Sequence, residues 1–106
     1  MIKIRFFFLT VAIFFSLLVL PVISDTMFDK GKDVFINKAS CGACHILLDA
    51  EAVGQIGPNL NDLKPETARI ANAVTNGVGV MPAFEGMLLP DEIEAVSYYV
   101  FKSTNQ

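Results

Sequence analysis

Three segments of the chain place their apolar residues three or four positions apart, which is the spacing of one face of a helix. The first segment covers residues 27–37, and Thr26 is its predicted N-cap. Its apolar stripe consists of Phe28, Gly31, Val34 and Phe35. We therefore predict a first helix that buries this stripe.

The second and third predicted helices span residues 65–76 and 90–102. Each begins at a proline, Pro65 or Pro90, because a residue without an N–H suits the first helical position. Gly77 ends the second helix. No segment alternates apolar and polar residues for long enough to predict a strand. The expected fold class is therefore all-α, with about three helices.

Two long irregular stretches, residues 46–64 and 77–89, separate these helices and are rich in glycine and proline. Loops of this length are uncommon in a small domain unless they serve a function, such as covering a bound group. We expect both loops to wrap around a ligand.

The N-terminal segment has the pattern of an export signal. Lys3 and Arg5 precede an apolar stretch over residues 6–20, and a cut before Asp25 would follow small or medium-sized residues. We interpret residues 1–24 as a signal peptide and residues 25–106 as one domain. The alternative is an uncleaved membrane anchor, because residues 6–23 approach the length that spans a bilayer. Both interpretations predict export, to a periplasm or alternatively to a thylakoid lumen.

The charge of the proposed mature domain is negative. Of the eight basic residues, Lys3 and Arg5 lie in the signal, so six remain against eleven acidic ones and leave a formal net charge of −5. Such a surface does not favour nucleic acid. It suits redox partner proteins with a basic docking patch, or it serves solubility alone. We expect a monomer.

The pentapeptide from Cys41 to His45 holds both cysteines and the only histidine of the chain. C-x-x-C-H is the attachment signature of c-type haem. Cys41 and Cys44 are spaced to bond the two vinyl groups of the haem, and the adjoining His45 supplies an axial imidazole to the iron. A thioredoxin-like dithiol is the alternative, but it would sit in a βαβ pattern that the chain lacks. A structural zinc site would need about four ligands.

The second axial ligand cannot be another histidine. Met81 is the leading candidate because glycines precede it and Pro82 follows it, so the backbone can approach the cofactor and then stiffens. Met87 and an open iron site remain as alternatives.

The tetrapeptide from Gly57 to Leu60 lies between these two motifs. A ligating histidine usually donates its second ring N–H to a neighbouring acceptor. We expect the carbonyl of Pro58 to accept that proton from His45, and Leu60 to pack on the ring.

The order of these motifs resembles that of small monohaem class I c-type cytochromes, including short bacterial proteins and the photosynthetic cytochromes of cyanobacteria and algae. The resemblance implies terminal helices that cross at right angles, with Gly31 and Phe35 against Tyr99. It also implies a cytochrome c-like fold around one covalent haem c. The segment from Phe35 to Cys41 is a residue or two longer than in many relatives, so the resemblance leaves the end of the first helix open.

The expected function is one-electron transfer through a haem with His45 and Met81 as axial ligands. No nucleophilic or proton-transfer constellation predicts an enzyme. The alternatives are a haem c subunit of a periplasmic dehydrogenase or oxidoreductase complex, an open-site haem protein, and a thiol oxidoreductase.

Overall fold

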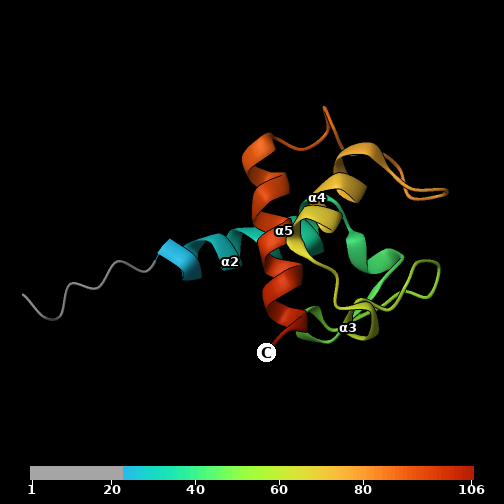
Figure 1. Cartoon of the computed structure of the whole chain (residues 1–106), viewed down its shortest axis with the longest axis horizontal. Helices are drawn as coiled ribbons and strands as arrows, with labels where there is room; N and C mark the ends of the chain where they lie inside the picture. The colour runs from blue at the N-terminus through green and yellow to red at the C-terminus, as the bar shows by residue number, and fades with distance from the viewer. Residues whose placement is uncertain (1–22) are drawn as a thin grey trace, which may run out of the picture.

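The computed structural model of the chain describes residues 23–106. The predicted signal peptide falls almost entirely outside this range. The elements in chain order are α2 (Ile23–Asp33), η1 (Val34–Lys38), η2 (Cys41–Ala43), β1 (Ile46–Leu47), η3 (Leu48–Ala50), β2 (Ala52–Val53), α3 (Leu60–Leu63), α4 (Thr67–Asn76) and α5 (Pro90–Thr104). The predicted all-α class is confirmed: four α-helices carry the described part of the chain, joined by long loops (Figure 1).

The first helix differs from its prediction at both ends. It begins at Ile23, so Thr26 lies inside it and is not its N-cap. It continues after Asp33 as a π-helical turn, closed by a 2.8 Å hydrogen bond from the Ala39 N–H to the Val34 carbonyl. A π-turn holds one more residue than an α-turn. The wider turn therefore accommodates the extra length between Phe35 and Cys41.

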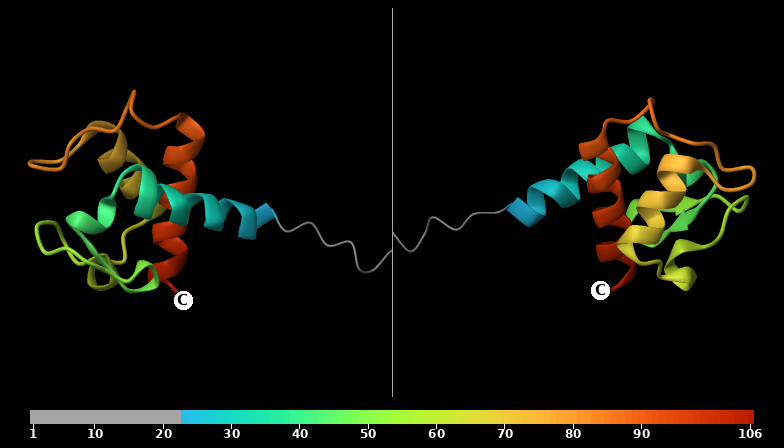
Figure 2. Two further views of the ribbon diagram at one scale, coloured as in Figure 1. Left: turned by 180° about the vertical axis from the view of Figure 1, so that it is seen from behind. Right: turned by 45° about the horizontal axis from the view of Figure 1, so that its top comes forward.

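Helix α2 packs across α5, and the crossing point is Gly31 (Figures 1 and 2). A Cβ atom at Gly31 would lie 2.0 Å from the carbonyl oxygen of Ala95 and 2.5 Å from the Cβ of Tyr99. The Phe35 ring meets the fully buried Tyr99 ring edge-on, with centroids 5.8 Å apart. The predicted contact of Gly31 and Phe35 with Tyr99 is confirmed, and only glycine allows the two backbones to come this close.

Helix α4 starts later than predicted. Its N-cap is Glu66, and Pro65 lies outside the helix and is buried. The cause is Lys64, which ends α3 in the left-handed conformation at a φ of 46° and redirects the chain before Pro65. Helix α5 begins at Pro90, as predicted, and runs two residues beyond Lys102.

The first long loop contains more structure than the sequence indicates. Strands β1 and β2 form a two-residue antiparallel hairpin, in which Ile46 pairs with Val53, so the prediction of no strand is wrong here. The short helix α3 follows, capped by the Asn59 side chain, which accepts hydrogen bonds from two backbone N–H groups. Such short elements bury too few residues to leave a periodic pattern.

The long loops around residues 54–58 and 77–83 reach to the same side of the molecule, opposite the start of α2 (Figures 1 and 2). The core lies between them and the crossed helices, and includes Phe35, Leu60, Val74 and Tyr99. Within residues 23–106, no helix is both long and apolar enough to cross a membrane.

Candidate cofactor site

A cavity of about 390 Å³ opens between the long loops and the helices. Its lining includes all six residues that the sequence selects, which come from three separate segments: Cys41, Cys44, His45, Pro58, Leu60 and Met81. These residues span forty positions of the chain. The fold brings these residues, which are distant in the sequence, together at one cavity.

The walls of the cavity are almost entirely apolar. The π-turn, α4 and α5 supply the side chains of Phe35, Ile70, Val74, Val96 and Val100. Arg69, on α4, is the one charged residue of the lining. A cavity of this character suits a large apolar group that carries a negative charge at one edge.

His45 is held in one orientation by its neighbours. Its Nδ1 atom lies 2.7 Å from the carbonyl oxygen of Pro58. Because a carbonyl can only accept, Nδ1 carries the proton and Nε2 is left with a free lone pair. Gly57 packs against the ring so tightly that a Cβ there would lie 2.5 Å from the His45 Cε1 atom. The hydrogen bond predicted between His45 and Pro58 is therefore present.

The two cysteines are unpaired thiols on and next to the 3₁₀ turn η2. Burial raises the pKa of Cys41 to about 11, so its thiol is protonated at neutral pH. A reactive redox dithiol needs the opposite shift, since the thiolate is the nucleophile. Cys41 is therefore not activated as a nucleophile in this environment.

Met81 is half-buried and follows a tight turn in the second long loop. The backbones of Val78 and Met81 exchange two hydrogen bonds, of 2.9 and 3.1 Å, which fix where the methionine leaves the turn. Met87, the alternative ligand, is 71% exposed and is not part of this cavity's lining. Only Met81 of the two candidates therefore lines the same cavity as His45.

The donor set fits a c-type haem. Two thiols within one turn, an imidazole with Nε2 free and a soft thioether lie on one apolar cavity. Such a haem is attached through thioether bonds formed by two cysteines. An imidazole and a methionine sulfur can ligate its iron.

The sequence did not indicate several residues of this site. Arg69 lies on α4 directly before Ile70, and only its place on the cavity reveals it. Ile56, Val78 and Val80 line the cavity although they are 63 to 87% exposed, so they form its rim. In the sequence, the signal for this rim was the position of these three apolar residues next to glycines in the long loops.

Comparison with known proteins gives a consistent result. The family described as "Cytochrome C oxidase, cbb3-type, subunit III" matches residues 26–100. Cytochrome c6 of Gloeothece citriformis is 37% identical over 84 residues, which cover 74% of this chain and 74% of the relative. Cytochrome c6 of Anabaena variabilis is 41% identical over 75 residues, covering 67% of this chain and 85% of the relative.

A solved structure is similar throughout the described fold. The crystal structure of the c-type cytochrome SorU from Sinorhizobium meliloti superposes with a TM-score of 0.73 at 45% sequence identity. The match covers 77% of this chain and 95% of that one.

Proposed function

This chain belongs to the c-type cytochrome family, and we propose that it carries single electrons on a haem iron held between His45 and Met81. The cofactor is one haem c, covalently bound through the C-x-x-C-H motif of Cys41 and Cys44. When bound, the group supplies reversible one-electron chemistry between ferric and ferrous iron. The protein is a haem-based electron carrier and not an enzyme. The observation that carries the axial assignment is the shared cavity of His45 and Met81.

His45 serves as the proximal ligand through Nε2. The Pro58 carbonyl, 2.7 Å from Nδ1, keeps the proton on that nitrogen and raises the basicity of the ring. Gly57 lets the loop lie against the imidazole, which fixes the plane of the ring.

Met81 serves as the distal ligand. Its thioether is a soft donor that favours ferrous iron, so His/Met ligation raises the reduction potential. The hydrogen-bonded turn at Val78 and Met81 would hold the thioether at the cavity when the haem is bound. Little rearrangement should then accompany electron transfer.

The apolar walls, among them the buried side chain of Leu60, would keep water from the bound group. Arg69 is suited to pair with the carboxylates of the cofactor, because a guanidinium matches carboxylate geometry. The rim of Ile56, Val78 and Val80 is the surface through which electrons would pass to a partner. Small contacts of this kind suit brief redox encounters.

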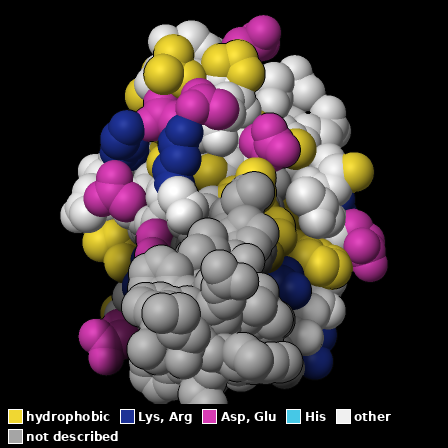
Figure 3. All heavy atoms as spheres, turned by 90° about the vertical axis from the view of Figure 1, so that its left-hand side faces the viewer, with side chains coloured by type: hydrophobic (Ala, Val, Ile, Leu, Met, Phe, Trp, Pro, Cys, Tyr) yellow, Lys and Arg dark blue, Asp and Glu magenta, His cyan; other side chains and the backbone are white. Residues whose placement is uncertain are grey.

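The partners are redox proteins, and we propose that they present a basic docking patch. The support is the formal charge of −5 on residues 25–106, with six basic residues against eleven acidic ones. On the face seen in Figure 3, Lys or Arg side chains lie beside acidic ones in the upper left of the view. Complementary charge would speed the encounter with a basic partner.

A haem c subunit of an oxidoreductase complex is the second candidate. The family match to an oxidase subunit and the exposed apolar rim both favour it. The free carrier and the subunit share the same cofactor chemistry. They differ in whether the protein copurifies with a larger complex.

We further propose that residues 1–24 direct export and that residues 25–106 work as a monomer in the periplasm. The positive and then apolar pattern of the N-terminal segment supports this assignment. A thylakoid lumen would meet the same requirement.

The test is a redox titration of protein purified from the exported fraction, followed by exposure of the reduced form to carbon monoxide. A carrier gives one single-electron wave and binds carbon monoxide slowly, because Met81 fills the distal position. Rapid binding would contradict Met81 ligation and favour an open-site haem protein. Haem found only on unexported precursor would contradict the export proposal.

A further inference from the structure

The segments that carry His45 and Pro58 are joined by three hydrogen bonds, and each links a residue to the one thirteen positions later. The three are Gly57 N–H to Cys44 carbonyl at 2.7 Å, His45 Nδ1 to Pro58 carbonyl at 2.7 Å, and Leu48 N–H to Asn61 Oδ1 at 2.8 Å. The constant offset means that the two segments run alongside each other without slipping. We call this set the proximal ladder.

Asn61 supplies the only side-chain acceptor of the proximal ladder. It is part of α3, whose N-terminus is capped by Asn59 and whose Leu60 is buried in the core. The Oδ1 atom of Asn61 therefore projects from an anchored helix. Its donor is the backbone N–H of Leu48, a residue that is 73% exposed. An anchored acceptor that holds the first residue of η3 limits how far the segment after His45 can move.

We propose that Asn61 is a positioning residue for the proximal histidine: its hydrogen bond to Leu48 closes the ladder and keeps the His45–Pro58 bond short. This inference rests on the proposed role of His45 as an iron ligand. The bond at Leu48 lies three residues beyond His45, and Asn61 lies three residues beyond Pro58. The Asn61 side chain thus joins the two segments three residues beyond the His45–Pro58 bond.

The sign of the effect follows from the chemistry of the imidazole. A short Nδ1–H bond to a carbonyl makes the ring a stronger donor through Nε2. A stronger donor stabilises ferric iron relative to ferrous iron. Loss of the Asn61 bond lets the segments separate, weakens the Nδ1–H bond and so raises the reduction potential.

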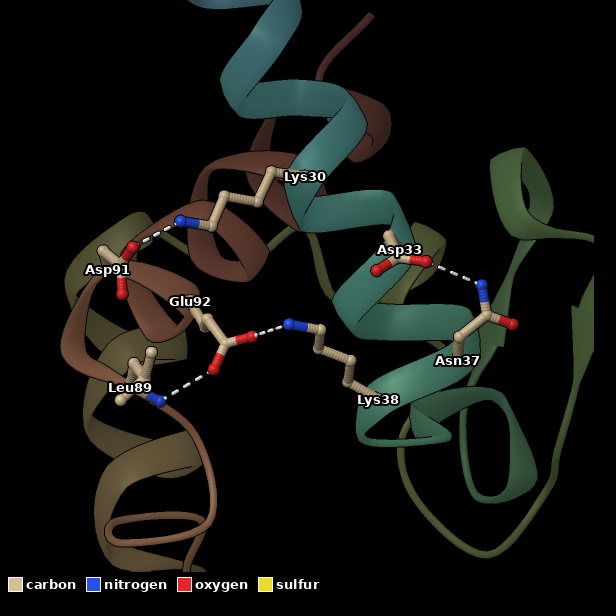
Figure 4. Close-up of polar contacts among 7 residues, drawn as sticks. All are labelled: Lys30, Asp33, Asn37, Lys38, Leu89, Asp91 and Glu92. Carbon is tan, nitrogen blue, oxygen red and sulfur yellow. Dashed lines mark hydrogen bonds and ion pairs between the residues drawn. The ribbon is translucent and has the colours of Figure 1, made fainter.

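The test measures the holoprotein with Asn61→Ala, Asn61→Asp and Asn37→Ala. Asn37 is the matched control, because its amide donates an exposed 2.7 Å hydrogen bond to Asp33, four residues earlier, and takes no part in the proximal ladder (Figure 4). Neither alanine variant changes the net charge. The readouts are deuterium exchange of the His45 Nδ1 proton by NMR, and the reduction potential.

Asn61→Ala should exchange the His45 Nδ1 proton about tenfold faster than wild type, the factor expected for loss of one neutral hydrogen bond. Its potential should rise, whereas Asn37→Ala should leave both readouts unchanged. Asn61→Asp retains an acceptor oxygen for Leu48 and should restore slow exchange. An unchanged exchange rate and potential in Asn61→Ala would overturn the inference. The bond from Leu48 to Asn61 would then be a loop contact with no effect on the histidine.

The same spectra separate this inference from the proposed function. A His45 ring bound to iron gives signals shifted far from those of a free histidine. If the wild-type protein lacks that shift, the assignment of His45 as ligand is wrong and the inference falls with it. If the shift is present but Asn61→Ala behaves like wild type, only the inference is wrong.

Discussion

The hydroxyl of Tyr99 donates a 2.7 Å hydrogen bond to the Asp49 carboxylate, which lies fifty residues earlier in the chain. Lys32 of α2 contacts the same carboxylate oxygen at 3.1 Å. Burial raises the pKa of Asp49, but the hydrogen bonds from Tyr99 and Lys32 outweigh it and hold the pKa below its ordinary value. One carboxylate thus ties the two terminal helices to the turn after β1, four residues beyond His45.

Replacing Tyr99 by phenylalanine tests this tie. The ring would keep its edge-on contacts with Phe28 and Phe35, so only the hydroxyl is lost. We expect the free energy of unfolding to fall by about 1.5–3 kcal/mol, the cost of one lost hydrogen bond to a charged group. Denaturant unfolding of the holoprotein measures it. Tyr98→Phe is the control, because Tyr98 is half-buried and contacts Lys102 through its ring; an equal loss there would contradict the account.

The start of α5 is held by two ion pairs from the first helix and its π-turn (Figure 4). Lys30 pairs with Asp91, both exposed, whereas Lys38 pairs with Glu92, whose side chain is only 7% exposed. Glu92 also accepts a 2.9 Å hydrogen bond from the Leu89 N–H. The hydrogen bond from Lys38 is the largest cause that lowers the pKa of Glu92, and the hydrogen bond from Leu89 is the second. The hydrogen bond from Lys30 lowers the pKa of Asp91.

These shifts predict how stability depends on pH. A carboxyl group with a lowered pKa stabilises the fold above its ordinary value, 4.5 for Glu92, and loses that contribution as the pH falls through the lowered value. The pKa of Lys38 is raised above 10.5, chiefly by its hydrogen bond to Glu92, so its contribution is present below 10.5 and lost as the pH rises through the raised value.

Lys38→Met should therefore destabilise the protein at pH 7 more than Lys30→Met, because it leaves a buried carboxylate without its cation. The difference should shrink as the pH falls below about 4, where Glu92 is protonated in the unfolded chain. Thermal unfolding between pH 3 and 8 measures both variants. Equal destabilisation by the two variants at pH 7 would show that the burial of Glu92 does not matter.

Gly57→Ala should disturb the proximal histidine directly. The added methyl group would lie 2.5 Å from Cε1 and 2.8 Å from Nδ1 of His45, so the ring or the loop must move. We expect a loss of about 1–3 kcal/mol in unfolding free energy, as for other overpacked sites, and an altered haem spectrum. The matched control is Gly86→Ala, outside the cavity lining, where a Cβ meets nothing within 4 Å although φ is +84°. The control should be slightly destabilised by that backbone strain, with an unchanged spectrum.

The sequence predicted those parts of the molecule that have a chemical or periodic signature. The C-x-x-C-H pentapeptide, the Gly31 crossing and the start of α5 at Pro90 each depend on residue types with few structural alternatives. The start of α4 was wrong because Pro65 suits the position before a helix as well as the first position within it. The left-handed conformation of Lys64 decides between these two positions of Pro65, and a lysine in the sequence does not predict that conformation.

The remaining features arise from tertiary contact. The π-turn is closed by a backbone bond from Ala39 to Val34, and its lysine at position 38 meets Glu92 from the far end of the chain. Asn61 reaches Leu48 only because the hairpin and α3 are folded beside each other. No local pattern encodes such pairs, so sequence periodicity could not reveal them.

Met81 is the residue on which the proposed function depends most. The most direct measurement compares the ferric absorption spectrum and the reduction potential of the wild-type holoprotein with those of Met81→Ala and Met87→Ala. We predict that only Met81→Ala loses the sulfur-to-iron charge-transfer band at the red end of the spectrum and shifts to a lower potential. A Met81→Ala protein that keeps the band and the wild-type potential would contradict His/Met ligation.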